Sequence, residues 1–167
     1  LTGTPGGYNS NVAEASVAQG GRFSFMTYNW YAARSIFGGN TWVYMSPFAG
    51  FADFCCDQVA IYDPARDLYI WLRMGSPNAS GVNRFRLSVS ERNAFQSTFW
   101  NYDFYPTNVN AAWTNEWWDY PHMAVGADYL YISWNIFSQA GLWQRSVMLR
   151  FPLDALAAAT GFSYNYM

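Results

Sequence analysis

The chain has 167 residues, the size of one domain with a sizeable core. Charged residues make up only 12% of it, and a net charge of −2 without any lysine argues against a non-specific nucleic-acid surface. No apolar run approaches the roughly 20 residues of a membrane-spanning helix. Low charge together with many aromatic, glycine, serine and asparagine residues predicts a secreted, extracellular protein.

The first predicted unit is a run of short strands joined by turns that contain paired glycines. Its strands are expected at residues 15–18, 22–28, 31–35 and 41–45. Short strands with tight turns at near-regular spacing indicate an all-β meander, because alternating strand and helix units would need long helical segments between the strands.

Two longer units follow, and they repeat one another. Leu68-Tyr69-Ile70 recurs as Leu130-Tyr131-Ile132, and an alternating apolar set that includes Leu87 recurs around Leu149. The expected strands lie at residues 58–62, 68–74, 83–90 and 98–105, then at 123–125, 129–136 and 144–151, before one helix at 153–160. A repeat built of alternating segments indicates one β unit used several times, as in the blades of a β-propeller.

One turn carries a family signature. Residues 35–42 read Ser-Ile-Phe-Gly-Gly-Asn-Thr-Trp, which resembles the Asp-box, S-x-D-x-G-x-T-W, of sialidase-like β-propellers, although Phe37 replaces the aspartate. Residues 90–100 resemble a stretched copy of the same box. The resemblance implies a structural hairpin between the third and fourth strands of a blade, away from the active site. It therefore supports the fold and transfers no catalytic residue.

Two further stretches carry a looser likeness. Residues 56–63 and 118–121 resemble the entrances of inner strands in uncharacterised secreted propeller proteins. We therefore expect residues 1–167 to form a single all-β propeller domain, or part of one, with about three blades of four antiparallel strands. Closed propellers have about four to eight blades. Further blades must then come from the same longer chain or from copies in a homo-oligomer, because natural proteins protect open sheet edges.

Asp57 and Asp119 are the first candidates for a functional site. Each precedes the expected first strand of a blade, so the two carboxylates should meet at the same end of the central channel. They would offer oxygen ligands to Ca²⁺ or to sugar hydroxyls, or else each would cap turn amides. His122, the only histidine, is a candidate proton shuttle or ligand, or an ordinary surface or core residue.

Cys55 and Cys56 are neighbours and the chain has no other cysteine. In an oxidising compartment their only intrachain partners are each other, which predicts a disulfide between adjacent residues. Two buried thiols or a bond to another chain are the alternatives.

The aromatic residues before the third unit give the functional hypothesis. Trp117 and Trp118 lie in a polar segment. One interpretation is that their indoles stack on sugar rings, and the alternative is that they pack between blades. With Glu116, Asp119, Asp57 and His122 they form the predicted ligand site for a glycan or polysaccharide. The sequence thus predicts a secreted glycan-binding module. A propeller hydrolase or lyase, using two carboxylates, and a structural subunit without ligand are the alternatives.

Overall fold

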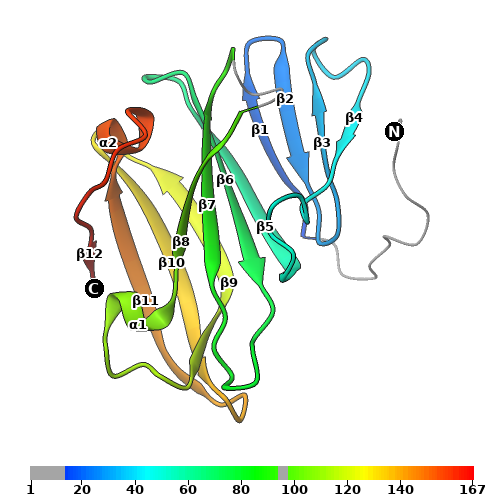
Figure 1. The fold of residues 1–167 in the computed structure, drawn as a ribbon. Helices are drawn as coiled ribbons and strands as arrows, with labels where there is room; N and C mark the ends of the chain where they lie inside the picture. The colour runs from blue at the N-terminus through cyan, green and yellow to red at the C-terminus, as the bar shows by residue number, and fades with distance from the viewer. Residues whose placement is uncertain (1–13, 94–97) are drawn as a thin grey trace.

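The computed structural model describes residues 14–93 and 98–167, which form three four-stranded antiparallel sheets that follow one another along the chain (Figure 1). The first sheet contains β1 (Ser16–Gly20), β2 (Phe23–Thr27), β3 (Ala32–Ser35) and β4 (Val43–Met45). The second contains β5 (Phe54–Asp63), β6 (Leu68–Gly75), β7 (Phe85–Glu91) and β8 (Trp100–Phe104). The third contains β9 (Glu116–Val125), β10 (Tyr129–Ser138), β11 (Trp143–Pro152) and β12 (Asn165–Tyr166). Two short helices, α1 (Pro106–Val109) and α2 (Leu153–Ala157), complete the described elements.

Each sheet is a meander in which strands that follow one another along the chain pair antiparallel. The β1–β2 turn contains Gly21 at a φ of 60°, where a glycine fits without strain. In the β5–β6 turn, the Asp63 carboxylate accepts a hydrogen bond from the Ala65 N–H at 2.9 Å, as aspartates in turns commonly do. The turn residues therefore explain why neighbouring strands in sequence are also neighbours in space.

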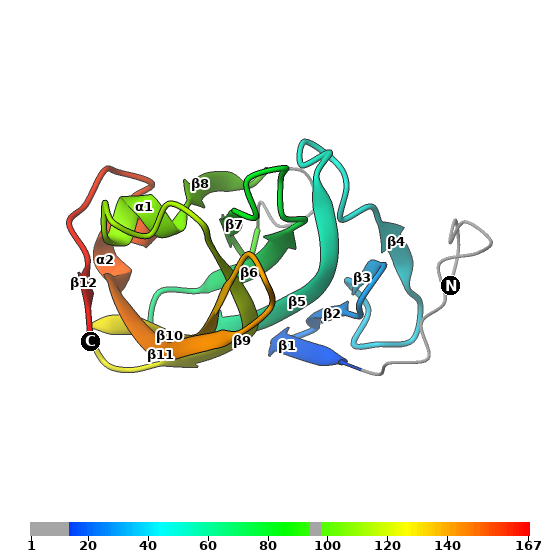
Figure 2. The ribbon, with the colours of Figure 1, turned by 90° about the horizontal axis from the view of Figure 1, so that it is seen from below.

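The second sheet lies between the other two and has both faces covered (Figure 2). All eight residues of β6 are buried for this reason. Alternate side chains point in opposite directions, so Ile70 and Leu72 join the core shared with the third sheet, whereas Tyr69 and Trp71 join the core shared with the first. Each large apolar side chain buried in this way contributes about 1.5–3 kcal/mol.

The first strands of the three sheets lie side by side, with β5 between β1 and β9. The Ser16 hydroxyl links β1 to β5, donating to the carbonyl of Ala60 and accepting from its N–H, both at 3.0 Å. Asn83 links the second sheet to β9 through two hydrogen bonds with the backbone of Trp118, at 2.8 and 2.9 Å. These side chains connect the second sheet to the sheets on either side of it.

Gln58 is the main polar connection between the first two sheets. Its amide nitrogen donates to the carbonyls of Tyr28 and Tyr31, and its amide oxygen accepts from the Trp71 indole N–H at 3.0 Å. Only 3% of Gln58 is exposed, so these bonds satisfy a buried amide as burial requires.

The prediction of an all-β chain with three four-stranded antiparallel sheets is confirmed. Two strands begin well before their predicted starts, because β5 begins at Phe54 rather than at 58 and β9 begins at Glu116 rather than at 123. In both strands a bulge interrupts the alternation on which the prediction depended. The helix expected over 153–160 is shorter, and α1 and the two-residue β12 were not predicted because such short elements carry no periodic signal.

The turn at residues 35–42 connects the third and fourth strands of the first sheet. The Ser35 hydroxyl accepts hydrogen bonds from the N–H groups of Phe37 and Gly39, at 3.2 and 3.0 Å. Gly38 and Gly39 have φ values of 64° and 88°. The serine and the glycines therefore shape the turn themselves, while the Phe37 side chain is 57% exposed.

Candidate functional site

A pocket of about 370 Å³ opens where β1, β5 and β9 lie side by side, and we call it the hub pocket. Its walls come from all three sheets or the residues just before them. They are Glu14, Ala15 and Ser16 beside β1, Asp57, Gln58 and Val59 of β5, and Tyr120, Pro121, His122 and Met123 of β9.

Two β-bulges shape this pocket. In β5, Cys55, Cys56 and Asp57 lie between the paired positions Phe54 and Gln58, opposite a single residue of β6. In β9, Tyr120 and Pro121 lie opposite a single residue of β10. Bulges redirect side chains and are frequent beside functional sites. Here the two bulges lie in β5 and β9, which neighbour one another and line the same pocket.

The bulge residues have constrained backbones. Cys56 and Tyr120 have φ values of 53° and 54°, in the left-handed region that residues other than glycine seldom adopt. A disulfide joins Cys55 to Cys56 inside the β5 bulge. Asp57 follows this disulfide directly, so the cross-link restrains the backbone that presents its carboxylate.

Three carboxylates influence one another at this point. Burial raises the pKa of Asp57 to about 7, and a hydrogen bond with Glu14 and the negative charges of Glu14 and Asp119 act in the same direction. A hydrogen bond with the Tyr120 backbone opposes the rise. Burial also raises the pKa of Asp119, with a smaller contribution from Glu14. The pocket therefore retains a proton near neutral pH.

Glu14 is held in place by a buried amide. The Asn29 side chain, only 4% exposed, donates to the Glu14 carboxylate at 2.6 Å and accepts from the Glu14 N–H at 3.4 Å. The charge of Glu14 is thus fixed beside Asp57.

An exposed aromatic pair forms the β9 side of the pocket. The Tyr120 side chain is 54% exposed, and its ring meets that of His122 edge to face with centroids 4.9 Å apart. The site therefore combines carboxylates with an accessible aromatic face.

Three of the residues predicted from the sequence lie together here. Asp57 and His122 line the hub pocket, and Asp119 acts electrostatically on Asp57. The expectation that Asp57 and Asp119 lie at the same end of neighbouring units therefore agrees with the geometry.

The other three predicted ligand residues lie elsewhere. Trp118 is fully buried and its ring contacts those of Phe85 and Trp134 in the core, which agrees with the alternative that it packs between sheets. Trp117 stacks on Phe137 and donates its indole N–H to a backbone carbonyl. Glu116 forms a bidentate ion pair with Arg145.

Sequence reasoning missed Glu14 and Tyr120. Glu14 precedes the first strand of its unit, as Asp57 and Asp119 precede the strands expected from the sequence, so the same positional argument would have found it. Tyr120 belongs to the aromatic segment before the third unit, but the sequence could not single it out, because its exposure depends on the bulge.

No group of three or more His, Cys, Asp or Glu side chains in residues 14–93 and 98–167 is arranged to hold a metal ion. We therefore do not propose the calcium site considered at Asp57 and Asp119. Among the described elements, no helix has the length and apolarity needed to cross a membrane.

Comparisons with protein-family models, curated proteins and solved structures gave no match to this chain. The likeness to sialidase-like propellers therefore depends on the turn and strand entrances alone. The function has to be argued from the hub pocket itself.

Proposed function

We propose that the hub pocket binds a glycan and that the protein is a carbohydrate-binding module. The observation that carries this proposal is the meeting of Glu14, Asp57 and Asp119 beside the exposed Tyr120 ring. Carboxylates orient sugar hydroxyls through hydrogen bonds, and an aromatic face stacks on the C–H groups of a sugar ring.

The raised pKa of Asp57 suits a glycan ligand. A sugar hydroxyl both donates and accepts hydrogen bonds, and a carboxyl pair that shares one proton can do the same. With a pKa of about 7, Asp57 offers a donor to part of the molecules at neutral pH while Asp119 offers acceptors.

Tyr120→Ala tests this proposal. A glycan array supplies a bound oligosaccharide, whose dissociation constant is then measured by titration calorimetry. We expect the substitution to weaken binding by about 1–3 kcal/mol, the usual effect of losing an aromatic anchor. Trp143→Ala is the matched control, because Trp143 is 59% exposed but does not line the pocket. Equal losses in both variants, or an array without any bound glycan, would contradict the proposal.

One observation favours a second function, glycoside hydrolysis. A general acid works best when its pKa lies near the operating pH, and Asp57 has a pKa of about 7. It would protonate the leaving oxygen while Asp119 or Glu14 acts as nucleophile or base. Turnover of an array-positive oligosaccharide that disappears in Asp57→Asn, with binding retained, would establish this function. Binding without any product would leave the module as the better description.

We further propose that the three sheets are successive blades of a β-propeller. The side-by-side order of β1, β5 and β9 supports this, since the first strand of each meander is then the innermost around one axis. More blades, from a longer chain or from further copies, would complete the ring. The mass of the 167-residue chain by sedimentation equilibrium tests the second route, and a stable monomer would contradict it.

Secretion is our last proposal on function. The disulfide between Cys55 and Cys56 supports it, because disulfides persist mainly in oxidising compartments. Alkylation of the natural protein without reductant should modify neither cysteine, and modification of both would contradict an oxidising location.

A further inference from the structure

A second cavity, of about 400 Å³, lies between the first and second sheets, and we call it the arginine cavity. Its lining residues are Arg34, Met45, Ser46, Ala49, Trp71, Arg73, Phe99 and Asn101. Two of the lining residues are cationic and none of those named is acidic. Gln58 of the hub pocket is hydrogen-bonded to Trp71 of this cavity, so the two sites flank one buried side-chain pair.

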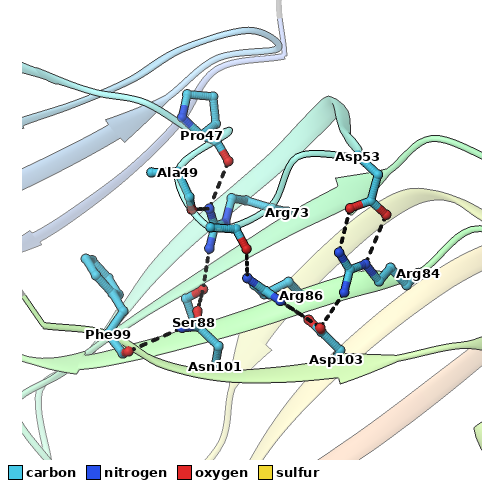
Figure 3. Close-up of polar contacts among 11 residues, drawn as sticks. Pro47, Ala49, Asp53, Arg73, Arg84, Arg86, Ser88, Phe99, Asn101 and Asp103 are labelled. Carbon is cyan, nitrogen blue, oxygen red and sulfur yellow. Dashed lines mark hydrogen bonds and ion pairs between the residues drawn. The ribbon is translucent and has the colours of Figure 1, made fainter.

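Arg73 is the central group of the arginine cavity. It is only 3% exposed, and its guanidinium lies over the Trp71 ring at 4.1 Å from the ring centroid. It donates to the carbonyls of Pro47 and Ala49 and to the Ser88 hydroxyl, at 2.8, 3.2 and 2.9 Å (Figure 3). A guanidinium has five N–H donors, and the buried Nε–H of Arg73 has no partner among the described residues.

The neighbouring arginines differ from Arg73 because carboxylates neutralise them. Arg84 pairs with Asp53 and Asp103, and Arg86 pairs with Asp103 at 2.6 Å (Figure 3). In the described part of the chain, no carboxylate lies within ion-pair distance of Arg73. Three arginines thus share two aspartates, and the excess positive charge is buried at Arg73.

A buried charge without an opposite charge is costly, so proteins normally pair it or bind an ion there. Burial lowers the pKa of Arg73 to about 9, the positive charge of Arg86 acts in the same direction, and burial also lowers the pKa of Arg34. The cavity beside these cations has room for a small group. Ser46 and Asn101 add polar side chains to its wall.

We propose that the arginine cavity binds an oxyanion, namely a carboxylate, sulfate or phosphate group, through Arg73 and Arg34. Guanidinium groups are the side chains best suited to such groups, because their N–H donors match pairs of anionic oxygens. The Trp71 and Phe99 rings would contact the apolar part of a molecule that carries the anion. This site is separate from the hub pocket and does not depend on the glycan proposal.

The test uses the full chain with ¹⁵N-labelled arginine and tryptophan. Sodium sulfate, sodium phosphate and sodium acetate are titrated separately at constant ionic strength, with sodium chloride as the reference. We expect saturable shifts of the Arg73 Nε–H and Trp71 indole signals with at least one oxyanion. The anion that binds most tightly distinguishes a carboxylate site from a sulfate or phosphate site.

Two variants decide whether those shifts report the cavity. Arg34→Gln and Asn101→Asp should each weaken the apparent affinity at least tenfold, by removing a cation or adding an opposing charge. Arg22→Gln is the matched control, since it removes an exposed arginine from the same sheet outside the cavity and should change affinity less than twofold. Shifts that never saturate, or that persist unchanged in Arg34→Gln and Asn101→Asp while thermal melts show folded protein, would overturn the proposal.

Discussion

The hub pocket and the arginine cavity are opposite in charge, although they flank the same buried pair, Gln58 and Trp71. Carboxylates gather in the first without a cation, and burial raises the pKa of Asp57. Arg34 and Arg73 both line the second, none of its lining residues is acidic, and burial lowers the pKa of Arg73. In both places the protein keeps like charges together, which costs stability and provides chemistry to a ligand.

Ion pairs elsewhere in the structure join opposite charges, unlike the groups in the two cavities. Arg66 bridges to Asp63 and Asp154, at 3.0 and 2.6 Å, and so joins the second sheet to the start of α2. Arg145 is paired with Glu116 and also lies over the Trp113 ring. Balanced pairs of this kind fasten elements to one another, so the unbalanced clusters are the better candidates for binding.

The largest effect is expected from Gln58→Leu, which removes the buried amide that links the hub pocket to Trp71 of the arginine cavity. The substitution leaves the carbonyls of Tyr28 and Tyr31 and the Trp71 indole N–H without their partner. Each buried unsatisfied group costs about 1–3 kcal/mol, so we expect a loss of roughly 3 kcal/mol or more. Urea unfolding measures it. A loss below about 1 kcal/mol would show that the first sheet is held without Gln58.

Asp57→Asn should have a smaller effect that depends on pH. The folded-state pKa of about 7 lies above the ordinary value near 4, so the folded protein binds the proton more tightly. The contribution of Asp57 to stability is then highest below about pH 4, falls as pH rises to about 7, and is constant above. Asn removes this fall, and we expect the Tm at pH 8 to rise by about 2–4 °C, which corresponds to roughly 1 kcal/mol.

The control for this prediction is the pH profile of the parent chain. If the Tm values of the parent and of Asp57→Asn change equally with pH between pH 4 and pH 8, the carboxylate cluster does not titrate in that range. The contrast between the two cavities would then be lost.

Glu116→Gln should have the smallest effect. The Glu116–Arg145 pair is partly exposed, with side-chain exposures of 16% and 36%, and such pairs contribute about 0–1 kcal/mol. We expect no change in glycan affinity and a change in unfolding free energy within that range. A large loss of glycan binding would show that Glu116 belongs to the ligand site, as the sequence predicted.

Much of the strand framework was predictable because alternation survives in regular strands. The buried side chains of β10 and β11 alternate with partly or fully exposed ones, which is the signal that located them. The site was only partly predictable. Asp57, Asp119 and His122 were found by position, whereas the two bulges erased the pattern in β5 and β9.

The sequence by itself determined the all-β meander and the three four-stranded units, because turn residues and alternation act locally. It predicted the bond between Cys55 and Cys56 only because the chain has no other cysteine. Only the tertiary structure decided which indole is accessible. Trp117 and Trp118 are adjacent, yet Trp117 is half-buried against Phe137 and Trp118 lies in the core. Tertiary structure also gathered Arg34 and Arg73 from different sheets, since no local pattern records which faces meet.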